Sequence, residues 1–342
     1  MKQRTKLFTL LVAATGMLML ILDSKTALAS ATEGLNLCIH AIIPSLFPFF
    51  VLSSMLTGAL SGSAGKLLSP IGKLCFIPAG QESILLSGFL AGYPVGAHAV
   101  CQEYEKGRLG KSDARRMLGF CSNAGPAFIF GIAGKLFTRR FIALILWAIH
   151  IASAIFVGIC LPKSENAPSK YPGHQQISIS LIILQSVKAL SSVCAWVILM
   201  RIVIGFFQRW ILWILPHSVS TVIVGLLELT NGCYALFHIP SESLRFILCN
   251  AFLGFGGICI LMQTISVTRP FGTGMYIPGK LLHCIFSVLL GILMQPILFP
   301  GEAFSKVTIL FTAIISISLF VLSILLKRKK EVAFSDMFVY NK

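Results

Sequence analysis

The sequence predicts an all-α polytopic membrane protein with about eight transmembrane helices and two re-entrant helical hairpins in two inverted repeats. Of the 342 residues, 56% are hydrophobic and only 12% are charged, about half the charged share of a soluble domain. The mean hydropathy is +0.86. The apolar residues come in blocks of about 20, the length that a helix needs to cross a bilayer. This composition excludes an ordinary soluble enzyme and a disordered chain.

Eight apolar blocks are predicted to span the membrane. An even number of spans places both termini on the same side, which we predict to be the inner one. The basic tail Lys327–Lys330 agrees with that orientation, whereas Lys135, Arg139 and Arg140 fall on the outer side and disagree with it. The first block is interpreted as an uncleaved span, and a signal peptide cleaved after Ala29 is the alternative. The blocks cover residues 7–22, 36–60, 114–136, 141–161, 177–207, 243–267, 279–298 and 304–326.

Two further apolar blocks, residues 81–103 and 218–238, are interrupted at their middles. Glycines and a proline break the first, and Glu228, Thr230 and Asn231 break the second. A proline removes a helical hydrogen bond, and irregular backbone at membrane depth survives only when protein buries it or when it lines a cavity. Re-entrant helical hairpins satisfy this condition.

The two halves of the chain match each other, because each interrupted block is followed by a glycine-broken helix. We therefore divide the chain into an N-terminal span and linker (1–35), a first repeat (36–162), a polar linker (163–176), a second repeat (177–327) and a basic cytoplasmic tail (328–342). Discontinuous segments at corresponding positions of two halves indicate a transporter binding site. The alternative is that the glycines only let the helices pack closely.

The predicted substrate-binding residues come from these irregular segments, and Glu228 is the acid that lies well inside an apolar stretch. An ionisable group at that depth is a candidate for function by default. We assign Glu228 and Lys188 to coupling or gating with H⁺ or Na⁺; a structural ion pair between these two residues is the alternative. The predicted substrate-binding residues are Gly92, Tyr93, Pro94, Gly96, Ser122, Asn123, Gly125, Pro126, Thr230 and Asn231.

Other residue types give no sign of catalysis. The net charge of +16 is carried mostly between and beyond the apolar blocks, where it orients spans, so we expect no nucleic-acid partner. The ten cysteines are scattered singly and are interpreted as free thiols, and four histidines near spans (40, 98, 150 and 283) as polar packing residues rather than metal ligands. No Walker, HExxH or GxSxG motif occurs. We expect no enzyme activity and no cofactor.

Three motifs and the opening Ile42–Phe50 segment carry a family resemblance over nearly the whole chain. The motifs are Gly92-Tyr93-Pro94-Val95-Gly96-Ala97, Phe120-Cys121-Ser122-Asn123-Ala124-Gly125-Pro126 and Glu228-Leu229-Thr230-Asn231-Gly232. The sequence resembles the YlbJ-type sporulation integral membrane proteins, which carry the nucleoside-transporter Gate domain and are related to concentrative nucleoside transporters. The resemblance implies two re-entrant hairpins and two broken helices around a midplane site.

The resemblance also implies a function: delivery of dipicolinate (pyridine-2,6-dicarboxylate) to the developing spore, from the outer forespore membrane of a bacterial cell. A secondary transporter or a facilitated pathway fits this role, with a small organic anion and the lipid bilayer as partners. The alternatives are a transporter of nucleosides or other small solutes, and a non-transporting structural membrane protein needed for sporulation. An intramembrane hydrolase lacks a credible catalytic set. Homo-oligomerisation is left open.

Overall fold

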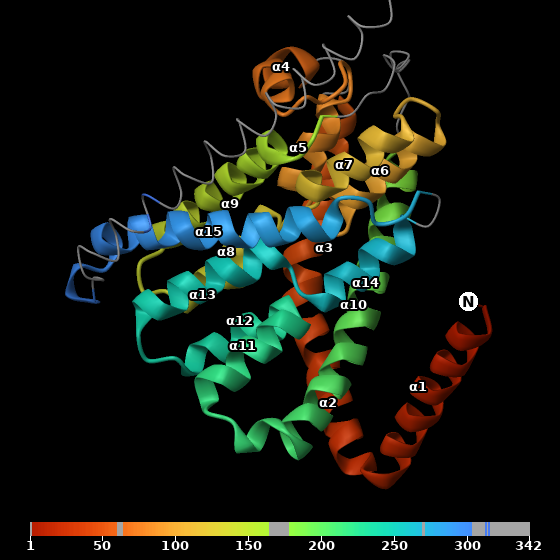
Figure 1. Ribbon diagram of the computed structural model, residues 1–342, viewed down its shortest axis with the longest axis vertical. Coiled ribbons are helices and arrows are strands. Elements are labelled where there is room, and N and C mark those ends of the chain that lie inside the picture. Colours follow the sequence, from red (N-terminus) through yellow and green to blue (C-terminus); the bar gives the residue numbers. More distant parts are fainter. Residues whose placement is uncertain are drawn as a thin grey trace, which may run out of the picture.

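The computed structural model describes residues 2–59, 64–163, 178–268 and 271–302, together with residues 312 and 314. Every regular element in these residues is helical (Figure 1). The predicted all-α class is therefore confirmed for the described part of the chain. The predicted span 304–326, apart from those two residues, the tail 328–342 and most of the linker 163–176 lie outside it.

Five helical stretches within the described residues are long and apolar enough to cross a membrane. In α1 (Lys2–Leu22) the apolar part, Thr9–Leu22, is shorter than a span. The five stretches are Ser24–Leu56, which joins α2 (Ser24–Leu37), a π-helical turn (Cys38–Ile42) and most of α3 (Ile43–Ala59); α9 (Phe141–Cys160); α10 (Ile179–Trp210); Glu242–Val267, which joins α13 (Glu242–Phe255) and α14 (Ile258–Val267); and α15 (Tyr276–Leu298).

Two further expected spans, besides residues 7–22, differ in the structure. Residues 114–136 do not form one helix: α7 (Lys111–Cys121) ends in an extended segment, and α8 (Pro126–Gly131) follows it. Both helices are too short to span, because the Asn123–Pro126 segment interrupts the apolar block. The helix expected at 36–60 begins instead at Ser24 and continues through residue 35 without a break.

The two interrupted blocks form helical hairpins. In the first hairpin, α5 (Glu82–Leu90) turns back into α6 (Val95–Glu105). In the second, α11 (His217–Leu227) turns back into α12 (Leu229–Ala235). The Gln81 side-chain amide donates to the Arg108 carbonyl at 3.4 Å, so the two ends of the first hairpin lie together.

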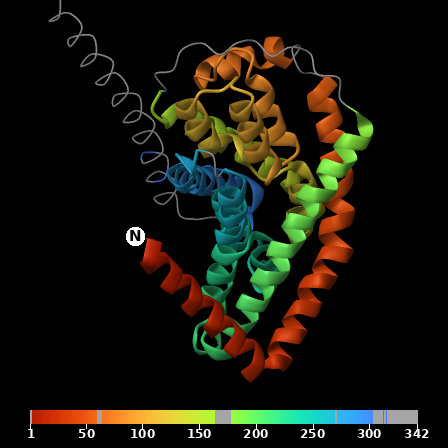
Figure 2. The ribbon, with the colours of Figure 1, turned by 90° about the vertical axis from the view of Figure 1, so that its right-hand side faces the viewer.

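The same order of elements occurs twice: a long helix, a hairpin, a broken helix and a second long helix. The first long helices run antiparallel, since the Trp210 indole near the end of α10 donates to Asp23 at the start of α2 (Figure 2). The second long helices, α9 and α15, are also antiparallel, because Arg139 ahead of α9 donates to the carbonyl of Leu298 at the end of α15.

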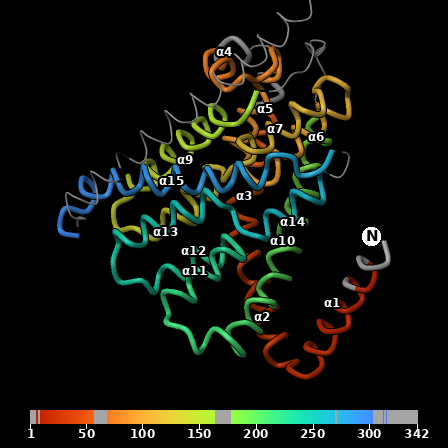
Figure 3. The backbone as a smooth tube through the Cα atoms, viewed as in Figure 1, coloured from red at the N-terminus to blue at the C-terminus, as the bar shows by residue number. Residues whose placement is uncertain are grey.

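Helix α15 contacts both halves of the chain. It packs against α7 and α9 of the first half and against α13 of the second (Figure 3). Its buried face includes the polar residues Lys280, His283, Ser287 and Gln295 among apolar side chains. The remaining helix, α4 (Ala64–Leu74), precedes the first hairpin.

Candidate functional site

The break between α7 and α8 is an extended segment that side chains stabilise. Ser122 and Asn123 are fully buried. The Ala124 amide donates to His150 Nε2 at 2.9 Å, and the Asn123 side-chain amide donates to the Phe120 carbonyl at 2.7 Å. These bonds satisfy polar groups that a continuous helix would have paired internally, as irregular backbone at membrane depth requires.

The first hairpin lies directly on this break through glycines. A β-carbon added to Gly88 or Gly96 would overlap the Cys121 carbonyl, and one added to Gly92 would lie 2.7 Å from the Gly125 nitrogen. Gly92 also has a φ of +80°, a conformation that glycine adopts without strain. Glycine at these positions therefore lets two irregular backbone segments touch.

Glu228 ends α11 and caps the N-terminus of α12. Its carboxylate accepts from the Thr230 amide at 2.9 Å, the Asn231 amide at 2.6 Å and the Asn231 side chain at 2.7 Å. The residue is only 2% exposed. A carboxylate at this position gains from the unpaired N–H groups and from the positive end of the helix dipole.

Glu228 and Lys188 do not form an ion pair in the structure. Lys188 is exposed on α10, and its ammonium lies near the His98 imidazole of α6. In the part of the chain that the structure describes, no lysine or arginine pairs with Glu228. Its stabilising partners are therefore N–H groups of its own hairpin.

The break between α13 and α14 consists of Gly256 and Gly257, both with positive φ. A β-carbon on Gly257 would lie 3.4 Å from the Leu226 and Leu227 carbonyls, so the second hairpin lies against this break. The first hairpin reaches it as well, because the Tyr93 hydroxyl donates to the Leu253 carbonyl at 3.4 Å.

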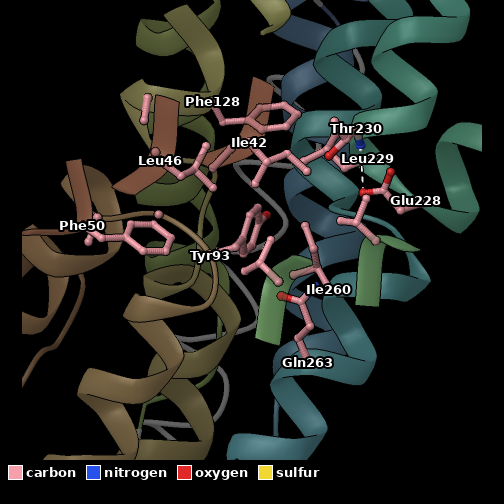
Figure 4. A pocket seen from close by; sticks show the side chains of 17 residues that line it. Ile42, Leu46, Phe50, Tyr93, Phe128, Glu228, Leu229, Thr230, Ile260 and Gln263 are labelled. Carbon is pink, nitrogen blue, oxygen red and sulfur yellow. Dashed lines mark hydrogen bonds between the residues drawn. The ribbon is translucent and has the colours of Figure 1, made fainter. Parts of the chain in front are cut away.

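Both hairpin tips and the break between α7 and α8 meet at one cavity of about 40 Å³, which α14 also lines (Figure 4). The tip of the first hairpin and the first break contribute Gly92, Tyr93 and Gly125, and the tip of the second hairpin contributes Glu228 and Thr230. Gln263 of α14 adds an amide, and apolar side chains of α3 and α10 complete a lining that is mostly apolar.

The predicted site residues thus divide into two groups. Gly92, Tyr93, Gly125, Glu228 and Thr230 line the cavity. The others lie behind it: Asn231 bonds to Glu228, Gly96 packs on Cys121, Pro94 precedes α6, Ser122 and Asn123 are buried in the first break, and Pro126 begins α8.

Lys280 is not among the predicted site residues, and His150 and His283 are predicted only to pack. Lys280 Nζ donates to the Tyr93 hydroxyl at 3.0 Å and to Asn123 Oδ1 at 3.2 Å. His150 and His283 stack with ring centroids 4.4 Å apart, and His283 Nε2 lies 3.0 Å from the His150 carbonyl. A lysine one residue inside the apolar block 279–298 was the signal that could have identified this cluster.

The apolar helices of spanning length define an integral membrane protein in which both hairpin tips and the break between α7 and α8 line one cavity. The chain is similar to the sporulation integral membrane protein YlbJ of Bacillus subtilis (strain 168), with 27% identity over 163 residues. This match confirms the resemblance that the motifs indicated. It covers 46% of the chain and only 40% of the relative. No family profile matches the chain, and no solved structure does.

Proposed function

We propose that this protein is a secondary transporter or facilitated pathway for a small organic solute and that it serves sporulation. The observation that carries the proposal is the meeting of two hairpin tips and the break between α7 and α8 at one cavity, with α14 completing its wall. Discontinuous helices at the centre of a membrane protein place unpaired backbone groups where a solute can bind them.

The repeated order of elements supports an inverted-repeat architecture. The paired long helices of the two halves run antiparallel, as halves of opposite orientation in the membrane require. Such repeats permit alternating access, in which one set of elements moves against the other around a fixed site. The two hairpins are the re-entrant elements of this architecture.

The structure corresponds to a closed conformation in this proposal. Ligand pockets for drug-sized molecules enclose about 300–1,000 Å³, whereas the central cavity encloses about 40 Å³. A solute therefore enters only when a hairpin tip moves. Glu228 holds the tip of the second hairpin, and protonation or a bound Na⁺ would weaken its bonds to the Thr230 and Asn231 amides. This dependence gives Glu228 a coupling or gating role.

Dipicolinate is the first candidate cargo, because the relative is named for sporulation and the family resemblance implies that solute. The outer forespore membrane is the corresponding location. A nucleoside is the second candidate. The mostly apolar lining with the Gln263 amide and the Glu228 carboxylate favours a flat neutral molecule with hydrogen-bond donors.

The test compares Glu228→Gln with Asn231→Ala in purified protein, measuring both solute binding and flux into proteoliposomes. We expect Glu228→Gln to retain binding and lose flux, together with its response to pH or Na⁺. We expect Asn231→Ala to weaken binding. Glu105→Gln, a change of an exposed acid on α6, is the matched control.

Full binding and full flux in both variants would reject the assignment of the site. A folded wild-type protein that moves neither dipicolinate nor nucleosides would favour the alternative, a structural membrane protein of sporulation in which the hairpins serve only packing.

A further inference from the structure

Lys280 is a buried lysine with no carboxylate partner among the described residues. It lies in the second turn of α15 and is 1% exposed. Its two hydrogen-bond acceptors, the Tyr93 hydroxyl and the Asn123 amide oxygen, are neutral. No ion pair joins Lys280 to a carboxylate within the described residues. An ammonium in such surroundings is costly unless a counter-charge arrives.

The surroundings of Lys280 are suited to a cation but do not neutralise it. Its Nζ lies 4.9 Å from the centre of the Tyr93 ring and 5.8 Å from that of Tyr276. Aromatic faces attract a cation with only about 0.5–2 kcal/mol. One turn further along α15, His283 stacks on His150, which is the acceptor for the Ala124 amide. These neighbours fix the position of the break beside Lys280.

Tyr93 stands between Lys280 and the central cavity. It lines the cavity (Figure 4). Its hydroxyl accepts from Lys280 Nζ. The hydroxyl occupies the position that a ligand oxygen would take beside the ammonium. Rotation of Tyr93 away from α15 would leave Lys280 facing the cavity with one N–H donor free.

We infer that Lys280 is the anion-binding residue of the central site and that Tyr93 covers it in the closed conformation. The ligand group is a carboxylate on a small planar molecule: one carboxylate oxygen displaces the Tyr93 hydroxyl and pairs with the ammonium. The inference rests on the proposed function only in that the ligand reaches Lys280 from the cavity.

Glu228 and Lys280 have different roles in this arrangement. Glu228 is satisfied by the N–H groups of the second hairpin, so it does not need Lys280. The ammonium is therefore available for a ligand, and an anion can bind in a site that also contains an acid. Charge-assisted bonds of this kind are about twice as strong as neutral ones, which gives the carboxylate an advantage over the tyrosine hydroxyl.

The test measures binding of two probes to the purified full-length protein by equilibrium dialysis: pyridine-2,6-dicarboxylate and its neutral analogue pyridine-2,6-dicarboxamide. We expect the wild type to prefer the dicarboxylate. We expect Lys280→Met to weaken dicarboxylate binding roughly 30-fold or more, as for loss of a buried charge pair, and to leave dicarboxamide binding unchanged. Lys280→Arg should keep part of the preference, and Lys25→Met, at an exposed lysine of α2, should behave as the wild type.

Tyr93→Phe provides a second, independent variant that keeps the aromatic ring. It removes the hydroxyl that competes for Lys280, so dicarboxylate binding should tighten about threefold. This variant keeps the inference testable if Lys280→Met fails to fold, which a thermal-unfolding scan would show.

Equal dicarboxylate affinity in wild type and folded Lys280→Met would overturn the inference, as would an equal loss for both probes or a folded wild type that does not bind the dicarboxylate. The proposed function has a different readout. Lys280-dependent binding without flux would reject transport and keep the anion site. Flux of a neutral solute that does not depend on Lys280 would support transport and reject the anion site.

Discussion

Gly225 and Gly232 face each other across the second hairpin so closely that a β-carbon on Gly232 would overlap the Gly225 Cα. Gly225 in turn lies against the Phe252 ring of α13. The two helices of this hairpin therefore approach at backbone distance, and the hairpin backbone lies directly against the Phe252 side chain. The first hairpin uses Gly88 and Gly96 against Cys121 in the same way. Close packing at these glycines therefore supports the hairpin tips that line the cavity.

Gly232→Ala should destabilise the second hairpin. The added methyl group must displace backbone rather than a flexible side chain, and overpacking of this kind costs about 1–3 kcal/mol. We expect a lower midpoint of thermal unfolding in detergent and reduced flux. Gly16→Ala in α1 is the control, since its β-carbon meets no atom within 4 Å. Equal midpoints for the two variants would show that the hairpin helices can separate freely.

Gly125→Leu and Pro126→Ala should have very different effects. A β-carbon on Gly125 would lie 3.1 Å from Gly92, so a leucine would push the first hairpin off the break. Pro126 occupies the first helical position of α8, where its missing N–H has no helical partner in any case. We expect solute binding to be lost in Gly125→Leu and largely kept in Pro126→Ala. Normal binding by both would make the break merely structural.

Cysteines introduced at Lys73 and Arg108 should be labelled from the same side of the membrane. These positions flank the first hairpin, and the Gln81–Arg108 hydrogen bond holds its ends together. Membrane-impermeant maleimide applied to sealed, oriented vesicles measures this. Labelling from opposite sides would show that residues 81–103 cross the membrane as a span.

Acid should weaken the start of α13 through Glu302. Its carboxylate accepts from the Ser241 hydroxyl at 2.5 Å and the Ser243 amide at 3.1 Å, and these bonds, the Ser241 bond foremost, lower the pKa of Glu302 below its usual value. A lowered pKa gives stability that is present above the usual pKa and is lost as the pH falls through the lowered value. Between about pH 7 and pH 3 the wild type should therefore lose more thermal stability than Glu302→Gln. Parallel losses would contradict this assignment.

The hairpins and breaks could be predicted from sequence, because Gly92, Pro94, Glu228 and the Gly256-Gly257 pair are incompatible with plain apolar helices. The residue at which α7 ends could not be predicted from sequence, since the apolar composition of residues 114–136 is compatible with a spanning helix. Sequence also could not choose the partner of Glu228. That choice depends on how α10 and α12 pack, and the structure places Lys188 on the exposed side of α10.

Lys280 shows most clearly what could not be predicted from the sequence. It lies only one residue inside an apolar block, where a lysine is typical of a membrane interface. Only the packing of α15 against α7 and α9 reveals that its side chain is buried beside Asn123. Residues at the ends of apolar blocks can be judged only after the helices that cover them are known.

His150 should be necessary for the extended backbone between α7 and α8. Its Nε2 accepts from the Ala124 amide, which is buried and has no place in a helical ladder. His150→Leu would leave that N–H unpaired at a cost of about 1–3 kcal/mol. We expect a lower midpoint of thermal unfolding and weaker solute binding, because the adjacent Asn123 and Gly125 lose their fixed positions.

His150→Gln separates this role from packing alone. The glutamine side chain offers a carbonyl oxygen that can accept from the Ala124 amide, so it should recover part of the stability and binding that leucine loses. His217→Leu, at an exposed histidine of α11, is the control for loss of an imidazole. If leucine and glutamine at position 150 behave alike, the Ala124–His150 bond does not hold the break, and the stacking of His150 on His283 is the contact that positions α9 against α15.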